Sequence, residues 1–315
     1  MKNVAFVFPG QGAQKVGMGC DLAQTFKKAS EAFKRADAIL EYPLSRLCWE
    51  GPEDELRKTS NTQPAILTTS IACNQALVQA GITPVAIAGH SVGEYAGLVA
   101  AGVLSFDDAL RLVRRRGELM QEAGDEAPGT MAAIIGMDYD AIKEACTEAH
   151  PTGIVEIANF NTPEQIVISG EVRAVQRAME IIKEKGARKV APLNVSGAFH
   201  TRLMKTAAEK LAVELEHVHF SRPSVPVVVN TTASALRDAL QIKEALKHQI
   251  LGNVLWVDSV KKMISLGVDT FVEVGPGKAL CGMIRKIDKY VHIYNVEDSE
   301  SLKKTVEAIR SEVYA

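Results

Sequence analysis

One short segment in the first third of the chain restricts its possible folds more than any other feature. An apolar run with a β-strand pattern, 84–88, leads directly into Gly-x-Ser-x-Gly, centred on Ser91, and then into a helical pattern, 94–101. A serine between a strand and a helix occupies a strained turn, so Gly89 and Gly93 leave room where the two elements crowd together. The segment predicts an α/β fold with Ser91 at a helix N-terminus, where the dipole favours developing negative charge. A tight turn without chemistry is the alternative.

The rest of the chain alternates short apolar strands with helical patterns, which indicates an α/β-hydrolase-like large domain. The strands expected in this domain are 4–8, 85–89, 226–230, 270–274 and 291–296. The helices expected are 20–40, 64–80, 92–101, 106–123, 201–218, 238–250, 256–266, 278–286 and 299–312. We expect this catalytic domain to comprise two stretches of sequence, 1–127 and 195–315.

Residues 128–194 follow a different order of elements. The elements expected there are strand 130–135, helix 138–149, strands 154–159 and 165–169, helix 171–185 and strand 187–193. This β-α-β-β-α-β order is that of the ferredoxin-like split βαβ unit. We therefore expect a small domain inserted into the large one, and a cleft between two domains is a preferred place for a ligand.

Charge, hydropathy and cysteine content exclude several classes of protein. The chain has 36 Lys and Arg against 38 Asp and Glu, whereas nucleic-acid-binding proteins usually carry a clear basic excess. No apolar run approaches the ~18 residues that span a bilayer, and the first apolar run ends in Pro9-Gly10, too early for a signal peptide. The five cysteines have no Cys-x-x-Cys spacing, which argues against a disulfide framework or a zinc site. We expect a cytoplasmic protein without a nucleic-acid or membrane partner.

A serine hydroxyl needs a base to act as a nucleophile, and His200 is the best candidate among seven histidines. It follows the small-residue loop Ser196-Gly197-Ala198-Phe199 and is in phase with the apolar stripe of the helix expected over 201–218. We expect His200 to open that helix, whose N-terminus would disfavour imidazolium and keep the base neutral. A buried structural histidine is the alternative.

One arginine lies on the wrong face of its helix. At about 100° per residue, Arg116 falls in the middle of the apolar arc of the helix expected over 106–123, whereas Arg111 and Arg114 point the opposite way. A buried guanidinium cannot lose its charge, so it requires an anionic partner. That partner is either a structural carboxylate of the protein or the carboxylate of a substrate.

Five motifs follow one another along the chain. They are Phe8-Pro9-Gly10-Gln11-Gly12-Ala13-Gln14, Gly89-His90-Ser91-Val92-Gly93-Glu94, Arg115-Arg116-Gly117 with Met120-Gln121, Gly197-Ala198-Phe199-His200, and Glu273-Val274-Gly275-Pro276-Gly277-Lys278. Their order and spacing resemble the malonyl-CoA:acyl-carrier-protein transacylases, the acyltransferases of fatty-acid and polyketide synthesis. The resemblance extends from Val4 to Val296, and the length is similar to that of the free-standing enzymes.

The resemblance implies roles for the central residues. Ser91 would be acylated, and His200 would be its general base. The backbone N–H groups of Gln11 and Val92 would form the oxyanion hole. Arg116 would bind the malonyl carboxylate, so that the substrate supplies the anion that its buried position requires.

The resemblance also implies supporting residues. Gln249 would orient His200 through its backbone carbonyl, which gives a Ser–His dyad without an acidic third member. Gln63 matches a residue that lines the pocket. Apart from the resemblance, the ring of Phe199 beside His200 should crowd a branch at the α-carbon of the acyl group. Three further residues match a motif of the small domain near the cleft: Asn159, Asn161 and Gln165. One departure is Gly252-Asn253-Val254, which stands where the family usually has Asn-Pro-Val.

The activity implied is a ping-pong transfer from malonyl-CoA to the phosphopantetheine thiol of holo-acyl carrier protein, without a metal or a redox cofactor. One alternative is a thioesterase or esterase of the α/β-hydrolase type, whose triad would use Asp269 or Glu273 with His292. His292 lies in the strand expected over 291–296, however, where it would point into the sheet stack. Another alternative is a non-catalytic module that binds carrier proteins.

A docking surface for the carrier protein is also expected. Acyl carrier proteins are acidic, so the surface that they contact should be basic. Four basic residues lie close in sequence to the catalytic loop: Lys183, Lys185, Arg188 and Lys189. A solvated face of the small domain is the alternative explanation of this cluster.

Overall fold

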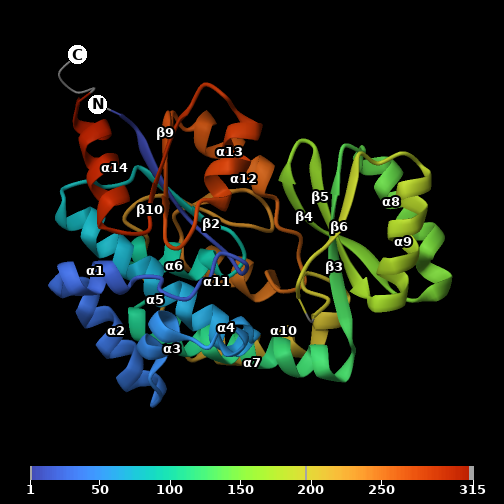
Figure 1. The fold of residues 1–315 in the computed structure, drawn as a ribbon, viewed down its shortest axis with the longest axis horizontal. Coiled ribbons are helices and arrows are strands. Elements are labelled where there is room, and N and C mark those ends of the chain that lie inside the picture. Colours follow the sequence, from blue (N-terminus) through green and yellow to red (C-terminus); the bar gives the residue numbers. More distant parts are fainter. Residues whose placement is uncertain (1, 196, 312–315) are drawn as a thin grey trace.

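The computed structural model describes residues 2–195 and 197–311, and it contains two separate sheets (Figure 1). A six-stranded sheet forms the centre of a large body, and a four-stranded sheet with two helices lies beside it. The α/β fold class predicted from the sequence is confirmed. Ser196 of the predicted catalytic loop and residue 312 of the last predicted helix lie outside the described residues.

The large sheet has the strand order β10-β9-β1-β2-β7-β8. Its strands are β1 (Val4–Phe8), β2 (Ala86–Gly89), β7 (Val227–Val228), β8 (Ala235–Leu236), β9 (Thr270–Val274) and β10 (His292–Val296). All neighbours are parallel except β7 and β8, which run antiparallel. The sequence predicts the five parallel strands but not β8, which has only two residues and therefore no recognisable pattern.

The helices of the large body differ from expectation mainly at their ends. They are α1 (Cys20–Thr25), α2 (Lys27–Leu40), α3 (Leu44–Glu50), α4 (Glu53–Arg57), α5 (Thr59–Gln79), α6 (Gly93–Ala100), α7 (Phe106–Glu126), α10 (Lys205–Glu216), α11 (Ala239–His248), α12 (Trp256–Ser265), α13 (Ala279–Ile287) and α14 (Ser299–Ser311). The short helices α3 and α4 were not predicted. The helix expected over 20–40 is interrupted at Phe26, whose backbone is extended.

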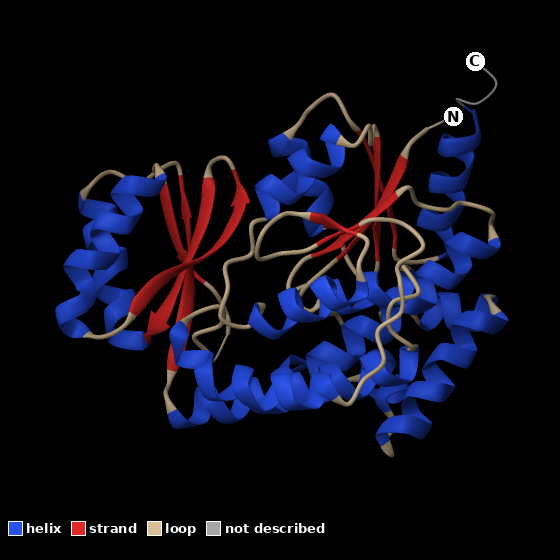
Figure 2. Cartoon of the chain, turned by 180° about the vertical axis from the view of Figure 1, so that it is seen from behind, coloured by secondary structure: helices blue, strands red, loops and turns tan. Residues whose placement is uncertain are grey.

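Alternate residues of the central strands face opposite sides of the sheet, and both sides are covered by helices (Figure 2). In β1, Val4, Phe6 and Phe8 belong to the core that contains α2, α5 and α7. Ala5 and Val7 belong to a second core that contains α12 and α13. Because both faces are buried, the strand reads as a continuous apolar run, as parallel strands usually do.

The small sheet has the order β4-β5-β3-β6, and all of its pairs are antiparallel. Its elements are β3 (Gly129–Ile135), α8 (Tyr139–Ala149), β4 (Val155–Thr162), β5 (Gln165–Glu171), α9 (Val172–Glu184) and β6 (Lys189–Pro192), with one 3-10 turn, η1 (His150–Thr152). One face of the sheet packs against α8 and α9. Residues of the other face, among them Met131 and Val167, join the core of the large body. The division into domains at 127/128 and 194/195 stays a prediction.

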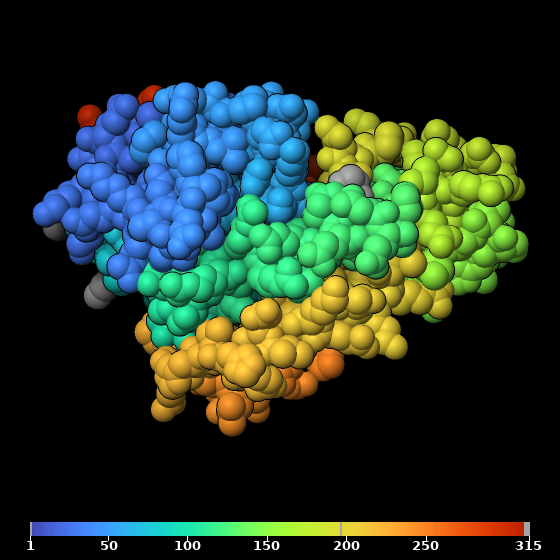
Figure 3. Space-filling model, turned by 90° about the horizontal axis from the view of Figure 1, so that it is seen from below, coloured from blue at the N-terminus to red at the C-terminus, as the bar shows by residue number. Residues whose placement is uncertain are grey.

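Helix α7 runs along one side of the molecule and leads into β3, so it connects the large body to the small sheet (Figures 1 and 3). In Figure 3 it crosses the surface between the blue N-terminal helices and the yellow α10. Its inner face therefore lies beneath the junction of the two units. None of the helices within residues 2–195 and 197–311 is long and apolar enough to span a membrane.

Candidate active site

The turn between β2 and α6 holds Ser91 in the strained conformation that the sequence predicts. Ser91 has φ 51°, in the left-handed region that residues other than glycine rarely occupy. A Cβ atom on Gly89 would lie 2.1 Å from the backbone of Gly93, and a Cβ on Gly93 would lie 2.2 Å from the carbonyl oxygen of Phe8. Strand and helix thus approach so closely that only glycine fits on either side of Ser91.

His200 lies next to Ser91, with its Nε2 atom 2.9 Å from Ser91 Oγ. Its Nδ1 atom is 3.1 Å from the carbonyl oxygen of Gln249 and 3.0 Å from that of Gly252. Carbonyl oxygens only accept hydrogen bonds, so the ring proton belongs on Nδ1 and Nε2 is free to accept the serine proton. Two backbone carbonyls therefore orient this base, and no carboxylate of the described residues contacts its ring.

Burial keeps His200 neutral. The residue is 4% exposed, and burial lowers its pKa to about 3, with the charge of Arg116 acting in the same direction. The prediction that His200 opens a helix is wrong, because the residue has φ 60° in a turn and α10 begins only at Lys205. Desolvation and a neighbouring cation thus take the place of the helix N-terminus that we expected to keep the base neutral.

Arg116 is 1% exposed, so the burial predicted from its helical phase is confirmed. Its Nη1 donates to Gln63 Oε1 at 2.7 Å, and its Nη2 donates to Gln249 Oε1 at 3.1 Å and to Ser91 Oγ at 3.2 Å. All three acceptors are neutral, and no carboxylate among the described residues lies within ion-pair distance of the guanidinium. A buried cation without a carboxylate contact thus lies directly beside the candidate nucleophile.

Two residues that the sequence analysis missed, Asn230 and Glu94, complete this arrangement. The side chain of Asn230 accepts from the N–H of Ser91 at 2.7 Å and donates to the carbonyl of Gly89 at 2.6 Å. Glu94 Oε2 accepts from the N–H of Asn230 at 3.1 Å and from Nε2 of Gln249 at 2.9 Å. Asn230 follows the apolar strand β7, the neighbour of β2, and a polar residue at that sheet edge is a signal that could have revealed it.

The loop after β1 brings Gln11 to the same place. Because β1 and β2 are parallel neighbours, their carboxyl ends lie side by side, and a Cβ on Gly10 would lie 2.6 Å from the carbonyl oxygen of His90. Gln11 and Ser91 line one cavity, and Val92 follows Ser91 directly. Within residues 2–195 and 197–311 the backbone N–H groups of Gln11 and Val92 have no acceptor. Their contribution to an oxyanion hole stays a prediction.

A cavity of about 270 Å³ lies between the large body and the small sheet, and its wall includes Gln11, Ser91, Arg116 and His200. The small sheet and the residue after β6 contribute apolar and amide side chains: Met131, Asn159, Asn161, Gln165, Val167 and Leu193. Asn161 Oδ1 lies 2.9 Å from His90 Nε2, so it connects β4 to the turn that holds Ser91. The cavity thus has a reactive, charged end and a largely apolar wall, which is typical of a small-molecule site.

The two residues predicted to contact the acyl group lie in different places. Phe199 lines the cavity beside His200, as expected. Gln63 is completely buried and lies behind Arg116, away from the cavity wall, so the expectation that it lines the pocket is wrong. Its amide holds the guanidinium between α5 and α7, because Nε2 of Gln63 also contacts the sulfur of Met120.

The triad of the hydrolase alternative is not assembled. His292 begins the edge strand β10, which β9 and β1 separate from β2, and it is exposed instead of pointing into the sheet stack. Glu273 is buried, and its carboxylate accepts from the N–H groups of Leu280 and Cys281 at the start of α13. Within residues 2–195 and 197–311, no three His, Cys, Asp or Glu side chains are placed to hold a metal ion.

Two of the four residues in the basic cluster expected to contact a carrier protein are paired within the protein. Lys185 forms ion pairs with Glu144 and Glu148, and Arg188 pairs with Glu164 at 2.8 Å. The cluster is therefore less positive than the sequence suggests. Its second half nevertheless lies close to the cavity, because β6, which begins at Lys189, leads directly to the lining residue Leu193.

The chain is similar to known proteins over most of its length. Residues 5–301 match the family described as acyl transferase domain. The malonyl CoA-acyl carrier protein transacylases of Bacillus subtilis (strain 168) and Escherichia coli (strain K12) are 45% and 48% identical, over 99% and 91% of this chain and 99% and 93% of theirs.

Solved structures are similar as well. The malonyl CoA-acyl carrier protein transacylase of Clostridium perfringens superimposes with a TM-score of 0.95 at 43% identity, over 100% of this chain and 99% of that one. A malonyl-transacylase in complex with its type II PKS acyl-carrier protein gives 0.94 at 43% identity, over 98% and 100%. The chain therefore belongs to the acyl transferase domain family and, within it, to the malonyl-CoA:acyl-carrier-protein transacylases.

Proposed function

We propose that this chain transfers the malonyl group of malonyl-CoA to the phosphopantetheine thiol of holo-acyl carrier protein, for fatty-acid or polyketide synthesis. One observation carries the proposal. Ser91 Oγ lies 2.9 Å from the neutral imidazole of His200 and 3.2 Å from the buried guanidinium of Arg116. A nucleophile between a base and a carboxylate-binding cation suits an acyl group that ends in a carboxylate.

In the first half-reaction Ser91 attacks the thioester carbonyl while His200 Nε2 takes the hydroxyl proton. The carbonyls of Gln249 and Gly252 stabilise the imidazolium through Nδ1–H, so the base needs no acidic third residue. The N–H groups of Gln11 and Val92 would receive the oxyanion, and each such donor is typically worth ~2.7–4 kcal/mol. The coenzyme A thiolate then leaves with the proton from His200.

In the second half-reaction the carrier-protein thiol attacks the malonyl ester of Ser91. His200 Nε2 removes the thiol proton and returns it to Ser91 Oγ as the ester bond breaks. Arg116 holds the malonyl carboxylate throughout, because its Nη2 already points to the reacting oxygen.

We also place the protein in the cytoplasm, since its five cysteines are free thiols, as expected in a reducing compartment.

The proposal is tested by intact-protein mass spectrometry after mixing with malonyl-CoA. The wild type should gain one malonyl group and lose it when holo-acyl carrier protein is added. Ser91→Ala should remain unlabelled. The control Ser265→Ala removes an exposed serine away from the site, and this variant should be labelled like the wild type. Transfer retained in Ser91→Ala, or release of malonate to water instead of to the carrier thiol, would contradict the proposal.

A further inference from the structure

Glu94 is a buried carboxylate that the proposed mechanism does not use. It lies in the first turn of α6, three residues after Ser91, and is 1% exposed. A charged carboxylate at such a position is costly unless hydrogen bonds and a positive charge stabilise it. Two N–H groups converge on its Oε2 atom, one from the backbone of Asn230 and one from the side chain of Gln249.

The amide of Gln249 connects this carboxylate to Arg116. Its Nε2 donates to Glu94 Oε2 at 2.9 Å, and its Oε1 accepts from Arg116 Nη2 at 3.1 Å. Arginine can only donate and an ionised carboxylate can only accept, so the amide oxygen must face Arg116 and the amide nitrogen must face Glu94. A cation and an anion are thus paired through one neutral side chain.

This indirect pairing of Glu94 with Arg116 through Gln249, which we call the relay, leaves the guanidinium available to a substrate. A direct bidentate carboxylate would occupy the donors of Arg116 and would have to be displaced by malonate. Here Nη2 also faces Ser91 Oγ, and Nε has no acceptor in the part of the chain that the structure describes. The anion is close enough to stabilise the buried charge, because electrostatic interactions are strong in a desolvated interior.

We propose that Glu94 is a positioning residue whose charge, relayed through Gln249, sets how strongly Arg116 selects an acyl group with a carboxylate. The inference rests on the proposed malonyl transfer. In the free enzyme Glu94 balances the buried cation. When the malonyl carboxylate arrives, two anions share one cation, and their mutual repulsion weakens the interaction of Arg116 with the substrate.

The sign of the effect follows from this competition. Removing the charge of Glu94 should strengthen the attraction of Arg116 for a malonyl carboxylate and should not help an acetyl group, which has no charge. The malonyl-to-acetyl ratio of kcat/KM should therefore rise. This is the opposite of the change expected when Arg116 itself is removed.

The decisive variant is Glu94→Gln, assayed with malonyl-CoA and acetyl-CoA. The glutamine oxygen can take the place of Oε2 and accept both N–H groups, so the charge changes while the two hydrogen bonds are kept. At about pH 8, above the pKa of Glu94, we expect the malonyl-to-acetyl ratio to rise about tenfold, which corresponds to ~1.4 kcal/mol. An unchanged or lower ratio would show that Glu94 only supports the turn, and would overturn the proposal.

Two further variants separate a charge effect from a general disturbance. Glu273→Gln removes another buried carboxylate, one that accepts backbone N–H groups of α13, and it should leave the ratio unchanged. In the double variant Glu94→Gln/Arg116→Ala the rise should disappear, because the cation on which Glu94 acts is gone. A rise that persists without Arg116 would refute the relay. A wild type that transfers no malonyl would instead refute the proposed function.

The wild type offers a second measurement if Glu94→Gln does not fold. Burial raises the pKa of Glu94 to about 7, so lowering the pH from about 8 to about 6 adds a proton to this carboxylate. Among the other titratable groups nearby, His200 stays neutral because burial lowers its pKa to about 3, burial also lowers the pKa of His90, and Tyr95 and Arg116 stay protonated. Ionisations of coenzyme A are common to both substrates and cancel. The ratio should rise as the pH falls, and a flat ratio would contradict the proposal.

Discussion

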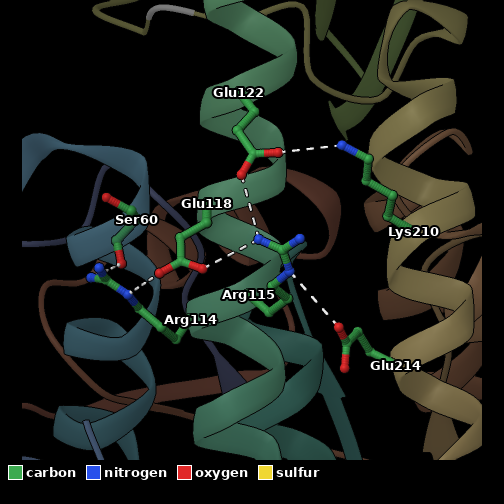
Figure 4. Close-up of polar contacts among 7 residues, drawn as sticks. All are labelled: Ser60, Arg114, Arg115, Glu118, Glu122, Lys210 and Glu214. Atoms are coloured by element: carbon green, nitrogen blue, oxygen red, sulfur yellow. Dashed lines mark hydrogen bonds and ion pairs between the residues drawn. The ribbon is translucent and has the colours of Figure 1, made fainter. Parts of the chain in front are cut away.

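Three consecutive arginines of α7 lie in two opposite environments. Arg114 and Arg115 point outward and contact carboxylates at the surface (Figure 4). Arg116 points inward, is 1% exposed, and donates hydrogen bonds to neutral oxygens. Arginines one residue apart on the helix therefore differ in their partners. On the outer face they are paired with carboxylates of the protein, and on the inner face the guanidinium has no carboxylate contact and can bind one.

The outer face shows what a structural arginine looks like in this protein. Arg114 donates to Glu118 Oε1 at 2.6 Å and to the carbonyl oxygen of Ser60 at 3.1 Å. That carbonyl is available because Pro64, four residues later in α5, has no N–H to donate to it. Arg114 and Arg115 thus both contact carboxylates that the protein itself supplies. The contrast supports the view that the carboxylate Arg116 lacks comes from a ligand.

Replacing the inner arginine should have the largest effect. Removing one partner of a desolvated charge pair costs ~2–5 kcal/mol, and at ~1.4 kcal/mol per tenfold Arg116→Ala should lose ~30- to several-thousand-fold in malonyl transfer. Acetyl transfer should rise relative to malonyl, because an acetyl group has no carboxylate and so loses no contact when the guanidinium is removed. The measurement is kcat/KM for both thioesters.

Arg114→Ala is the matched control for that experiment. It removes an arginine from the same helix and should keep the malonyl-to-acetyl ratio of the wild type, because Arg114 does not reach the cavity. If Arg116→Ala also kept the wild-type ratio, the inner arginine would be a structural residue, and the contrast between the two faces would have no functional meaning.

Surface charges near the cavity mouth should have an intermediate effect, and only on the second half-reaction. Reversing Arg188 and Lys189 to Glu should slow transfer to an acidic carrier protein about tenfold, because rim charges mainly change association rates. Acylation by malonyl-CoA should be spared. Since Arg188 already pairs with Glu164, the control Glu164→Gln should increase carrier transfer slightly. Equal salt dependence in wild type and double variant would show that the carrier protein docks elsewhere.

Local sequence patterns predicted the parts of the site that depend on local geometry. The two glycines around Ser91 follow from the crowding of strand and helix, and the burial of Arg116 follows from its phase on α7. These inferences need only neighbouring residues and the repeat of a helix or strand. The same holds for the β-α-β-β-α-β order of the middle segment.

The parts that depend on distant backbone were not predictable in this way. We expected His200 at the start of a helix, but it lies in a turn, and its ring is oriented by carbonyls of Gln249 and Gly252, about fifty residues later. Glu94 and Asn230 meet through hydrogen bonds that span more than a hundred residues. No spacing or periodicity encodes such contacts, because they arise from the order of strands in the sheet.

The outer face should show the smallest effect, and Arg115→Ala tests it. Arg115 is 38% exposed and lies 3.4–3.8 Å from three carboxylates, those of Glu118, Glu122 and Glu214. When it is removed, Glu118 keeps Arg114 and Glu122 keeps Lys210, so only Glu214 loses its partner (Figure 4). Exposed pairs of this kind contribute ~0.2–1 kcal/mol, so the free energy of unfolding in urea should fall by no more than that.

The loss in Arg115→Ala should shrink further at about 1 M salt, where surface charges are screened. The malonyl-to-acetyl ratio should equal that of the wild type, because solvent screens these exposed charges and the body of α7 keeps Arg116 in place. A loss above ~2 kcal/mol would exceed what solvated ion pairs provide. A changed ratio would mean that the outer charges position α7 and, through it, the guanidinium beside Ser91, in which case the two faces of the helix act as one unit.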